Sequence, residues 1–418
     1  MAMELNVQVI SNNLANMTTT GYKRQRAEFQ DLLYDHVSRV GTQTSSQGNI
    51  LPVGIDLGSG VKTVGTGRLM SQGSLTQTGN PFDVAIRGDG FFKIQLPDGT
   101  YAYSRDGSFK TDAQGRIVTA QTLGGTGALK VGADFLRRIA PNAEIWISDP
   151  SWENHRAIFT QAGFTVETYP YYNAARRGID FDSMLTALNA APEGTIVVLH
   201  ACCHNPTGYD LTPAQWDQVI PVLKARKLVP FIDMAYQGFG QGIAEDGAVI
   251  GKFVASGLDC FVATSFSKSF SLYGERVGAL SVLCANKEEA ARVLSQLKIV
   301  IRANYSNPPT HGGQVVATVL NTPQLRALWE QELAAMRVRI KEMRKAMVQK
   351  LKAAGVKQDV SYIQDQVGMF SYSGLSKEQM VRLRNEFAVY GTDSGRICVA
   401  AVNSKNIEHV CQSIAKVI

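Results

Sequence analysis

Apolar residues recur at helical spacing near the start of the chain, at Leu5, Val9, Leu14 and Met17. A period of three to four residues places such side chains on one face of an α-helix. The pattern predicts a helical region over residues 5–34 with a turn at Thr20-Gly21, because glycine tolerates the backbone conformations of tight turns.

Residues 40–119 carry a different pattern. Residues 40–80 are rich in Gly, Ser, Thr and Gln, which predicts extended or loosely ordered chain. Residues 82–119 alternate short apolar runs with turn signals, which predicts a set of short antiparallel strands. The turn signals are Arg87-Gly-Asp-Gly90, Pro97-Asp-Gly99, Arg105-Asp-Gly107 and Gln114-Gly115.

After residue 121 the chain alternates apolar runs of strand length with helical stretches. This order favours an α/β fold with a mainly parallel, doubly wound sheet. The strand candidates are Ile145–Ile147, Thr195–Leu199, Leu228–Ile232, Cys260–Thr264 and Gly278–Leu283. Apolar residues at three- and four-residue spacing over residues 324–354, with interleaved Arg, Lys and Glu, predict a long amphipathic helix that packs one stripe on a core.

Composition places the chain among ordinary globular proteins. Its 418 residues are 44% hydrophobic and 19% charged, and no apolar run reaches the ~18–20 residues that span a membrane. The net charge of +6 comes from basic residues spread along the chain, so nucleic-acid binding is not indicated. The N-terminus lacks the basic and apolar regions of a secretory signal.

The six cysteines form no short framework and no CxxC pair. Cys202-Cys203-His204 has metal-binding residue types, but adjacent cysteines rarely both ligate one zinc with good geometry. No second ligand pair follows at a useful spacing. We therefore expect no metal site and a reduced chain in the cytoplasm.

Candidate chemistry centres on Lys268 in the run Ser265-Phe-Ser-Lys-Ser-Phe-Ser-Leu-Tyr-Gly-Glu-Arg276. An amine forms a Schiff base with an aldehyde, and hydroxyls with a guanidinium hold a phosphate. The run therefore fits covalent attachment of a phosphorylated aldehyde cofactor. Taken alone, the Ser-x-x-Lys pattern is equally that of a surface lysine in a serine-rich loop.

Three other groups, Asn205, Asp233 and Tyr236, also lie just past strand ends, where open α/β sheets bind ligands. A carboxylate there can keep a pyridine nitrogen protonated, which makes pyridoxal phosphate an electron sink. Gly124-Gly-Thr-Gly127 precedes a helical stretch and suits a phosphate. Each feature has a plain alternative, a helix N-cap for Asp233 and an ordinary strand-to-helix turn for the glycines.

In combination, these motifs resemble those of class I aminotransferases, with the greatest similarity to bacterial aromatic-amino-acid aminotransferases and their aspartate relatives. The resemblance runs from about residue 119 to the C-terminus. It implies a fold-type-I enzyme with a large cofactor domain over residues 121–310 and a small α+β domain over residues 311–418. The segments that carry it are Cys202–Gly208, Asp233–Phe239, Ser265–Gly278, Arg302–Pro309 and Gly395–Ala400.

The resemblance implies pyridoxal 5'-phosphate as cofactor and roles for the matching residues. Lys268 would bind the cofactor and move the proton at the substrate α-carbon, and Asp233 would pair with the pyridine nitrogen. The other cofactor contacts would be Tyr236 and Asn205 at the ring hydroxyl, Trp152 stacked on the ring, and Gly125, Thr126, Ser265 and Arg276 at the phosphate. Arg276 would also lower the proton affinity of Lys268, which suits a base near neutral pH.

The implied reaction is transamination of aromatic amino acids, and of aspartate, with 2-oxoglutarate. Arg396 would bind the substrate α-carboxylate as a bidentate fork, beside Asn205 and Trp152. Arg302 would cross a homodimer interface to reach a side-chain carboxylate. Taken singly, each arginine is equally a surface ion pair worth ~0–1 kcal/mol.

The first part of the chain resembles a different family, the rod and hook proteins of the bacterial flagellum, and among them the distal-rod protein most. This resemblance covers about residues 3–120. It implies a structural protein of the flagellar basal body, with other rod subunits as partners and packed terminal helices. The segments that carry it are Asn12–Asn16, Thr20–Lys23, Asp83–Phe92 and Tyr103–Phe109.

The two resemblances meet at Val118–Gly125, which predicts a fusion at residue 120. Residues 116–119 would then supply the start of the strand that enters the phosphate loop. Because class I aminotransferases normally begin earlier, we expect the enzyme to lack an N-terminal dimer arm, and lost apolar burial costs ~25 cal/mol per Å². Two functions remain open, a cytoplasmic aminotransferase impaired by truncation and a flagellar rod protein with an inactive enzyme passenger.

Overall fold

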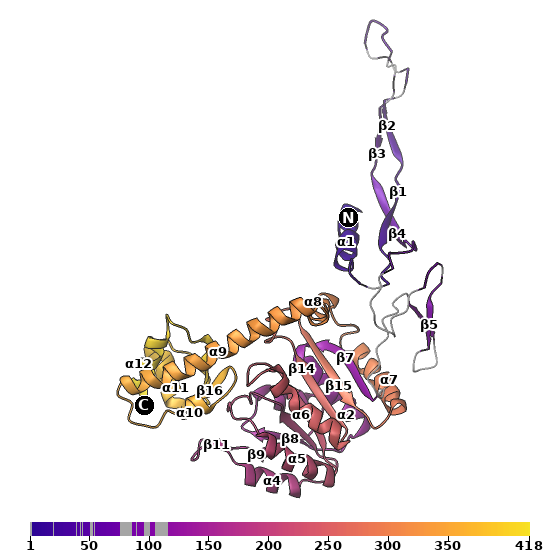
Figure 1. Cartoon of the computed structure of the whole chain (residues 1–418). Coiled ribbons are helices and arrows are strands. Elements are labelled where there is room, and N and C mark those ends of the chain that lie inside the picture. Colours follow the sequence, from indigo (N-terminus) through magenta and orange to yellow (C-terminus); the bar gives the residue numbers. More distant parts are fainter. Residues whose placement is uncertain are drawn as a thin grey trace. The chain divides into compact units, whose positions relative to one another are not determined.

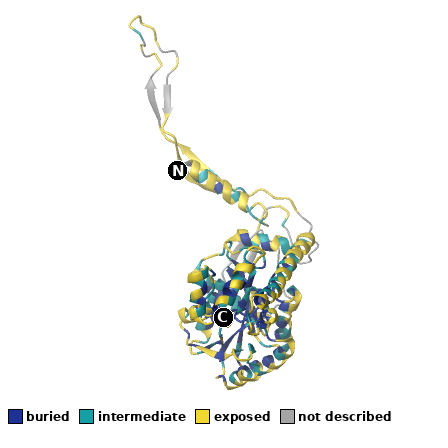
Figure 2. Cartoon of the chain, turned by 90° about the vertical axis from the view of Figure 1, so that its left-hand side faces the viewer, coloured by how far each residue is buried: buried dark blue, intermediate teal, exposed yellow. Residues whose placement is uncertain are grey.

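The computed structural model describes residues 2–19, 21–38, 40–41, 43, 45–50, 53, 55–75, 86–88, 90–95, 101–104 and 116–418. The chain divides into two compact units, residues 1–111 and residues 112–418 (Figure 1). Figure 2 shows that the described residues of the first unit are largely exposed, whereas the second contains a buried interior. No helix in the described part of the chain is long and apolar enough to span a bilayer.

The described residues of the first unit form one helix and three antiparallel strand pairs. Helix α1 (Ala2–Ala15) contacts strand β1, and the pairs are β1 (Gln25–Asp31) with β4 (Val61–Arg68), β2 (Tyr34–Ser38) with β3 (Ile55–Gly58), and β5 (Phe92–Gln95) with β6 (Tyr101–Ser104). Among the residues of this unit whose burial is described, Val9 is the one buried hydrophobic side chain. These residues therefore contribute little apolar burial.

The helix predicted for residues 5–34 is wrong beyond its turn, because residues 25–31 form strand β1. The Asn13 amide nitrogen donates to the Gln25 carbonyl oxygen at 2.7 Å, and the Asn13 side-chain oxygen accepts from the Gln25 N–H at 2.8 Å. These two bonds hold the chain reversed against α1, so it continues as a strand.

The extended chain predicted within residues 40–80 is present as β3 and β4, and the antiparallel strands predicted within residues 82–119 are present as β5 and β6. Of the turn signals, Pro97–Gly99, Arg105–Gly107 and Gln114-Gly115 lie outside the described residues, as does Asp89 in the signal at residues 87–90.

The second unit contains a seven-stranded sheet in the order β7-β15-β14-β13-β12-β8-β9. Strands β14, β13, β12, β8 and β9 are parallel to one another. Strand β15 is antiparallel to both β14 and β7. The strands are β7 (Ile117–Leu123), β8 (Ile145–Asp149), β9 (Val166–Pro170), β12 (Ile196–His200), β13 (Val229–Met234), β14 (Cys260–Ser265) and β15 (Val277–Leu283). The mainly parallel sheet is confirmed, and each of the five predicted strands is found.

Helices cover both faces of this sheet, so its central strands are apolar on both sides. One core joins Val198 and Phe231 to α2 (Gly124–Ile139), α3 (Glu153–Gln161) and α7 (Lys287–Asn304). The opposite core joins Val197 and Ile232 to α4 (Phe181–Ala190), α5 (Pro213–Ala225) and α6 (Ile243–Ser256). A hairpin of β10 (Tyr172–Asn173) and β11 (Gly178–Ile179) stands apart from the sheet.

A third core lies in the C-terminal part, where the predicted long helix is confirmed as α9 (Pro323–Ala353). This core also includes Tyr236 and Phe239, so it packs against the loop that follows β13. The remaining elements are α8 (Thr310–Asn321), α10 (Tyr362–Asp365), β16 (Phe370–Tyr372), α11 (Lys377–Phe387), β17 (Arg396–Cys398), a 3₁₀ turn (Val399–Ala401) and α12 (Ile407–Val417).

Strand β7 spans the position where the two sequence resemblances meet. All seven of its residues pair with β15, from Ile117 opposite Leu283 to Leu123 opposite Val277. Val118 and Thr122 are buried in this edge strand. Residues 117–120 therefore belong to the sheet, as the first part of a strand that leads directly into α2.

We expect a protein that begins at residue 112 to keep the stability of the second unit, whereas one that begins at residue 124 loses more than about 2 kcal/mol. The second truncation exposes the sheet surface that Val118 covers and removes the ladder to β15. Urea unfolding of both proteins checks this. Loss of the folded state on removal of residues 1–111 would show that the second unit depends on the first.

Candidate active site

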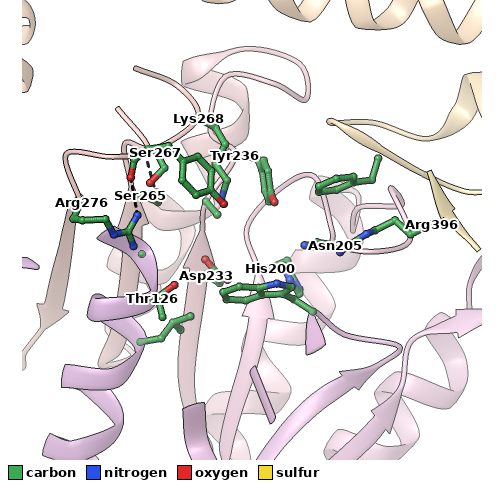
Figure 3. Close-up of a pocket in the computed structure, with 16 residues that line it drawn as sticks. Thr126, His200, Asn205, Asp233, Tyr236, Ser265, Ser267, Lys268, Arg276 and Arg396 are labelled. Atoms are coloured by element: carbon green, nitrogen blue, oxygen red, sulfur yellow. Dashed lines mark hydrogen bonds between the residues drawn. The ribbon is translucent and has the colours of Figure 1, made fainter. Parts of the chain in front are cut away.

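A pocket of about 200 Å³ opens where β12, β13 and β14 end and α2 begins (Figure 3). It brings together every predicted site residue except Arg302. These residues are Gly125, Thr126, Trp152, Asn205, Asp233, Tyr236, Ser265, Lys268, Arg276 and Arg396. Leu129, His200, Ala235, Ser267, Tyr273 and Phe370 complete the lining.

One end of the pocket suits an anion. Helix α2 begins at Gly124 without a side-chain cap, so the N–H groups that follow Gly124 in the first turn of this 16-residue helix are available to a ligand. Gly125 and Thr126 lie in this first turn, and Ser265 and Arg276 face it. A Cβ on Gly125 would lie 2.9 Å from the Ser265 Cβ. The close approach keeps the serine hydroxyl beside the helix N-terminus.

Main-chain contacts fix this end of the pocket. The Gly124 N–H donates to the Arg276 carbonyl oxygen at 3.0 Å, and the Arg276 Nη2 donates to the Leu123 carbonyl oxygen at 3.1 Å. A Cβ on Gly278 would lie 2.3 Å from the Gly124 carbonyl carbon. Strand β15 and the start of α2 therefore touch through main-chain atoms.

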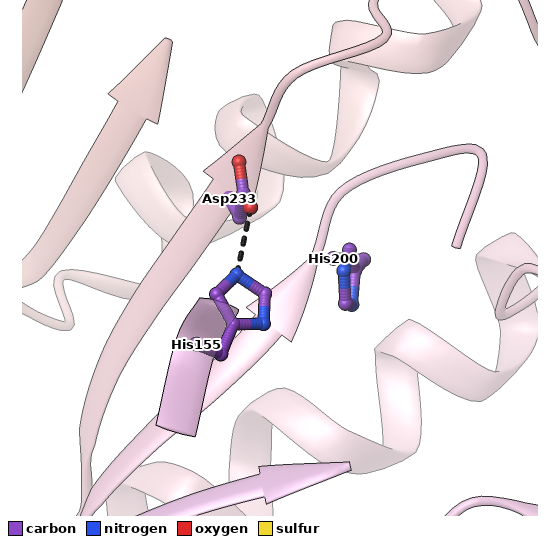
Figure 4. A group of neighbouring side chains, drawn as sticks. All are labelled: His155, His200 and Asp233. Atoms are coloured by element: carbon purple, nitrogen blue, oxygen red, sulfur yellow. Dashed lines mark hydrogen bonds and ion pairs between the residues drawn. The ribbon is translucent and has the colours of Figure 1, made fainter. Parts of the chain in front are cut away.

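Asp233, at the end of β13, is buried and held by a histidine that the sequence analysis did not single out. The Asp233 Oδ2 lies 2.8 Å from the His155 Nε2 (Figure 4). The His155 Nδ1 lies 2.9 Å from the Ser151 Oγ. Burial by itself would raise the pKa of Asp233, but the His155 hydrogen bond and the charge of Lys268 lower it below its ordinary value. The carboxylate therefore stays ionised at neutral pH.

Lys268 lies in the turn after β14 and is largely buried. Its Nζ lies 4.5 Å from the centre of the Tyr236 ring and 5.6 Å from that of Tyr273. Burial lowers the pKa of the Lys268 amine below its ordinary value, and Arg276 adds to this effect while Asp233 opposes it. The expected influence of Arg276 is confirmed, with burial as the larger cause.

His200, at the end of β12, has both ring nitrogens buried, and neither has a hydrogen-bond partner among the described residues. Burial, assisted by His155, lowers the pKa of His200 to about 3. The imidazole is therefore neutral and has one donor and one acceptor available. Because the ring lines the pocket, these unpaired atoms indicate that a polar ligand completes the site.

Arg396, in β17, lies at the end of the pocket away from Arg276 (Figure 3). Its Nη1 donates to the Asn205 side-chain oxygen at 2.8 Å, and its guanidinium carbon lies 4.6 Å from the centre of the Phe370 ring. The fork thus retains donors for a planar acceptor such as a carboxylate.

Arg302 is not in the pocket. It lies near the end of α7, and its Nη1 bonds the Ser306 hydroxyl. The contact it was expected to make involves a second chain, so its role stays a prediction.

Several lining or supporting residues were absent from the sequence prediction. Ser267 and Tyr273 lie inside the serine-rich run around Lys268, so that motif contained a signal for them. His155, His200 and Phe370 had none, because their neighbours in the sequence form no recognisable pattern.

The residues of this pocket fit pyridoxal 5'-phosphate. The helix N-terminus with Arg276 suits the phosphate, the ionised Asp233 suits the pyridine nitrogen, and the Lys268 amine suits the aldehyde. Two clusters among the described residues have metal-binding types, His155, His200 and Asp233 in this pocket, and Cys202, Cys203 and Asp246 nearby. Both Asp246 oxygens already accept main-chain N–H groups.

Fold and pocket together define a fold-type-I transferase of the class I aminotransferase kind. Residues 106–414 match the model of the family aminotransferase class I and II. An aspartate aminotransferase of Pseudomonas aeruginosa is 60% identical over 306 residues, which are 73% of this chain and 77% of that protein. The aromatic-amino-acid aminotransferase of Escherichia coli is 54% identical over 304 residues, with the same shares.

A crystal structure of the aromatic-amino-acid aminotransferase of Burkholderia pseudomallei, covalently bound to pyridoxal phosphate, has the same fold. Its TM-score is 0.72 at 64% identity, over 73% of this chain and 76% of that one. The chain belongs to the class I and II aminotransferase family. Residues 1–23 also match the model of the flagella basal body rod protein family, so both resemblances are confirmed, the N-terminal one over this short stretch.

The neutral, buried His200 makes stability depend on pH. Its folded pKa of about 3 is below its unfolded value, so its contribution is complete above about pH 6.5 and is lost as the pH falls toward 3. As the pH falls through this window, the free energy of unfolding decreases. We expect this decrease to be smaller in His200→Asn than in the wild type, by roughly 1.4 kcal/mol per pH unit. Urea unfolding from pH 7 to 4 measures this slope.

Gln218→Asn, at an exposed position of α5, provides the control, because it introduces the same side chain and removes no titratable group. This variant should leave the pH dependence of the unfolding free energy unchanged. Equal slopes in the wild type and the His200→Asn variant would contradict the buried, neutral state of His200.

Proposed function

We propose that this chain is a pyridoxal-phosphate-dependent enzyme that transaminates aromatic amino acids, and aspartate, with 2-oxoglutarate. The observation that carries the proposal is one pocket that contains an anion site, an ionised Asp233, a buried Lys268 amine and a guanidinium fork at the opposite end. Two of the matched relatives, an aspartate aminotransferase and an aromatic-amino-acid aminotransferase, support it.

When bound, pyridoxal phosphate supplies the electron sink for the carbanion at the substrate α-carbon. Asp233 holds a proton on the pyridine nitrogen by its negative charge, and the His155 and Ser151 chain keeps the carboxylate oriented. Burial lowers the pKa of the Lys268 amine. This amine would accept the proton from the α-carbon of the amino acid and, in the reverse half of the reaction, would return a proton to that carbon.

Two ends of the pocket orient the reacting groups. The first turn of α2 with Ser265 and Arg276 holds the phosphate, and Arg396 with Asn205 holds the α-carboxylate. Tyr236 and Asn205 would hold the ring hydroxyl, and Trp152 would cover one face of the ring. With anions held at both ends, the substrate α-carbon would be oriented toward Lys268, which lines the same pocket.

The pocket walls favour aromatic substrates. Trp152, Tyr236 and Phe370 line it with apolar rings, and Arg396 is the guanidinium at the substrate end among its described lining residues. An aromatic side chain gains burial and ring contacts there. Aspartate needs a second cation, which Arg302 of a partner chain would supply in a homodimer.

In the proposed enzyme, the large domain is residues 121–310 and the small domain is residues 311–418.

We place this activity in the cytoplasm and propose no rod function for the chain. The flagellar likeness rests on residues 1–23, and few described side chains in the first unit are buried. The substrates and products are soluble amino and 2-oxo acids.

Cofactor titration tests the proposal. Addition of pyridoxal 5'-phosphate to the purified protein should produce a band in the near-ultraviolet to visible range that borohydride abolishes, since reduction removes the bond between the Lys268 amine and the aldehyde carbon from conjugation. Coupled assays should then show glutamate formation from tyrosine or phenylalanine and 2-oxoglutarate. A protein that acquires no such band sinks the proposal.

Lys268→Ala should lower transamination by more than about a thousandfold while the protein still binds the cofactor without a covalent bond, because the phosphate and Asp233 contacts remain. Activity is measured by the glutamate assay and binding by equilibrium dialysis. Lys298→Ala, at an exposed position of α7, should match the wild type. Retained activity of Lys268→Ala would show that another group moves the proton.

A further inference from the structure

Arg344 is a fully buried arginine that lies outside the pocket. It belongs to α9, and its side chain is 2% exposed. From this position we propose that Arg344 is a positioning residue for substrate binding, which acts by holding the pocket residue Phe370 against the carboxylate-binding Arg396. The proposal rests on the proposed function and assigns Arg344 no contact with substrate or cofactor.

Every hydrogen bond that Arg344 donates goes to one segment of main chain. Its Nη1 donates to the Ile363 carbonyl oxygen at 3.0 Å, and its Nη2 donates to those of Gly368 at 2.9 Å and Phe370 at 2.5 Å. A rigid guanidinium fork thus fixes both ends of the segment from residue 363 to residue 370. A lysine ammonium, a point charge on a flexible stem, lacks the planar geometry that sets these donors at fixed positions.

This arrangement is costly for stability alone. Burial lowers the pKa of Arg344 to about 10, so the group remains charged at neutral pH, and its three bonds go to neutral oxygens. A hydrophobic side chain of similar volume avoids the desolvation of a buried charge. The neighbours in α9, Ile340, Met347 and Val348, are buried hydrophobics that would accept one. The particular gain from an arginine here is the fixed place of the carbonyl oxygens.

The held segment determines where Phe370 lies. Its ring stands below the Arg396 guanidinium at 4.6 Å, and such a contact orients the cation as well as attracting it. The Arg396 Nη1 in turn donates to the Asn205 side-chain oxygen. The path from Arg344 to the substrate end therefore consists of one main-chain carbonyl, one ring and one guanidinium.

The same segment also packs on the loop that contains Asn205. The Val367 N–H donates to the Gly208 carbonyl oxygen at 2.7 Å. Gly368 adopts a left-handed backbone with φ of +80°, and a Cβ there would lie 2.6 Å from the Cys203 Cβ. Loss of the Arg344 fork would consequently loosen both supports of Arg396.

The phosphate end of the pocket is independent of this support. Arg276 and Thr126 lie at the opposite end from Arg396 (Figure 3), and none of the three carbonyl oxygens held by Arg344 belongs to that end. The inference therefore predicts a change in carboxylate affinity with cofactor binding retained. A role confined to overall stability predicts no such separation.

The test is calorimetric titration of the cofactor-loaded protein with 3-phenylpropionate, a non-reacting carboxylate with an aromatic ring. Arg344→Met should weaken its binding about tenfold, the effect expected when an oriented charge contact is lost, while the cofactor band remains. In turnover, KM for phenylalanine should rise by about the same factor and kcat should change less. Arg339→Met is the matched control, because Arg339 also lies in α9 and bonds the Val402 and Ala400 carbonyl oxygens, but not the held segment.

A double variant decides whether Arg344 acts through Phe370. If it does, Arg344→Met combined with Phe370→Leu weakens 3-phenylpropionate binding no more than the stronger single change. Additive losses would overturn the path proposed here. If Arg344→Met does not yield folded protein, Arg344→Lys replaces it, and it should weaken binding because the single ammonium nitrogen of lysine cannot occupy the two positions from which Nη1 and Nη2 donate.

The outcomes separate the two proposals. Unchanged binding in folded Arg344 variants, or equal weakening in Arg339→Met, overturns the positioning role even if the enzyme is active. Absence of transamination in the wild type, with 3-phenylpropionate still bound and weakened by Arg344→Met, overturns the proposed function and leaves the positioning role in place. A wild type that binds no 3-phenylpropionate overturns the positioning role.

Discussion

The parallel pairing of β12, β13 and β14 is the constraint on which the pocket depends. Its register places His200 opposite Asp233 and Asp233 opposite Ala263, so groups more than thirty residues apart end at one edge. Any slip of one residue would exchange the two faces of a strand and turn these side chains into the helices that cover the sheet. The two apolar cores on either side therefore protect the chemistry as well as the fold.

The pocket also depends on how each buried charge is balanced. Asp233 has a hydrogen-bonded histidine, Lys268 has an opposing carboxylate and an adjacent guanidinium, and Arg344 has only dipoles. These three solutions differ in consequence. The first keeps a charge fixed, the second leaves an amine easier to deprotonate, and the third fixes a backbone. The environment of each group, more than its residue type, determines what it can do.

The sequence was most informative where a residue's role depends on nearby residues. The central strands are continuous apolar runs because both faces are covered, and the run around Lys268 also contains Ser265 and Arg276, which line the same pocket. The edge strand β9 escaped notice because residues 166–170 mix buried and exposed positions. Arg344 looked like one of the polar residues on the exposed side of an amphipathic helix. It is buried because the C-terminal core surrounds α9 beyond its apolar stripe. His155 meets Asp233 across 78 positions, a separation that no local pattern encodes.

The contact between Gly124 and Gly278 has a consequence for how the anion site can change. Where main chain meets main chain, no side chain can rotate away, so a substitution must move a strand or a helix. The start of α2 is therefore fixed to β15 whatever side chains surround it. Substitution of Ser265 or Arg276 would weaken the hold on a phosphate but leave the positive end of the helix in place. Side-chain substitutions can therefore change the affinity of this end of the pocket for an anion in small steps. The position of the anion site is determined by the backbone and does not change with them.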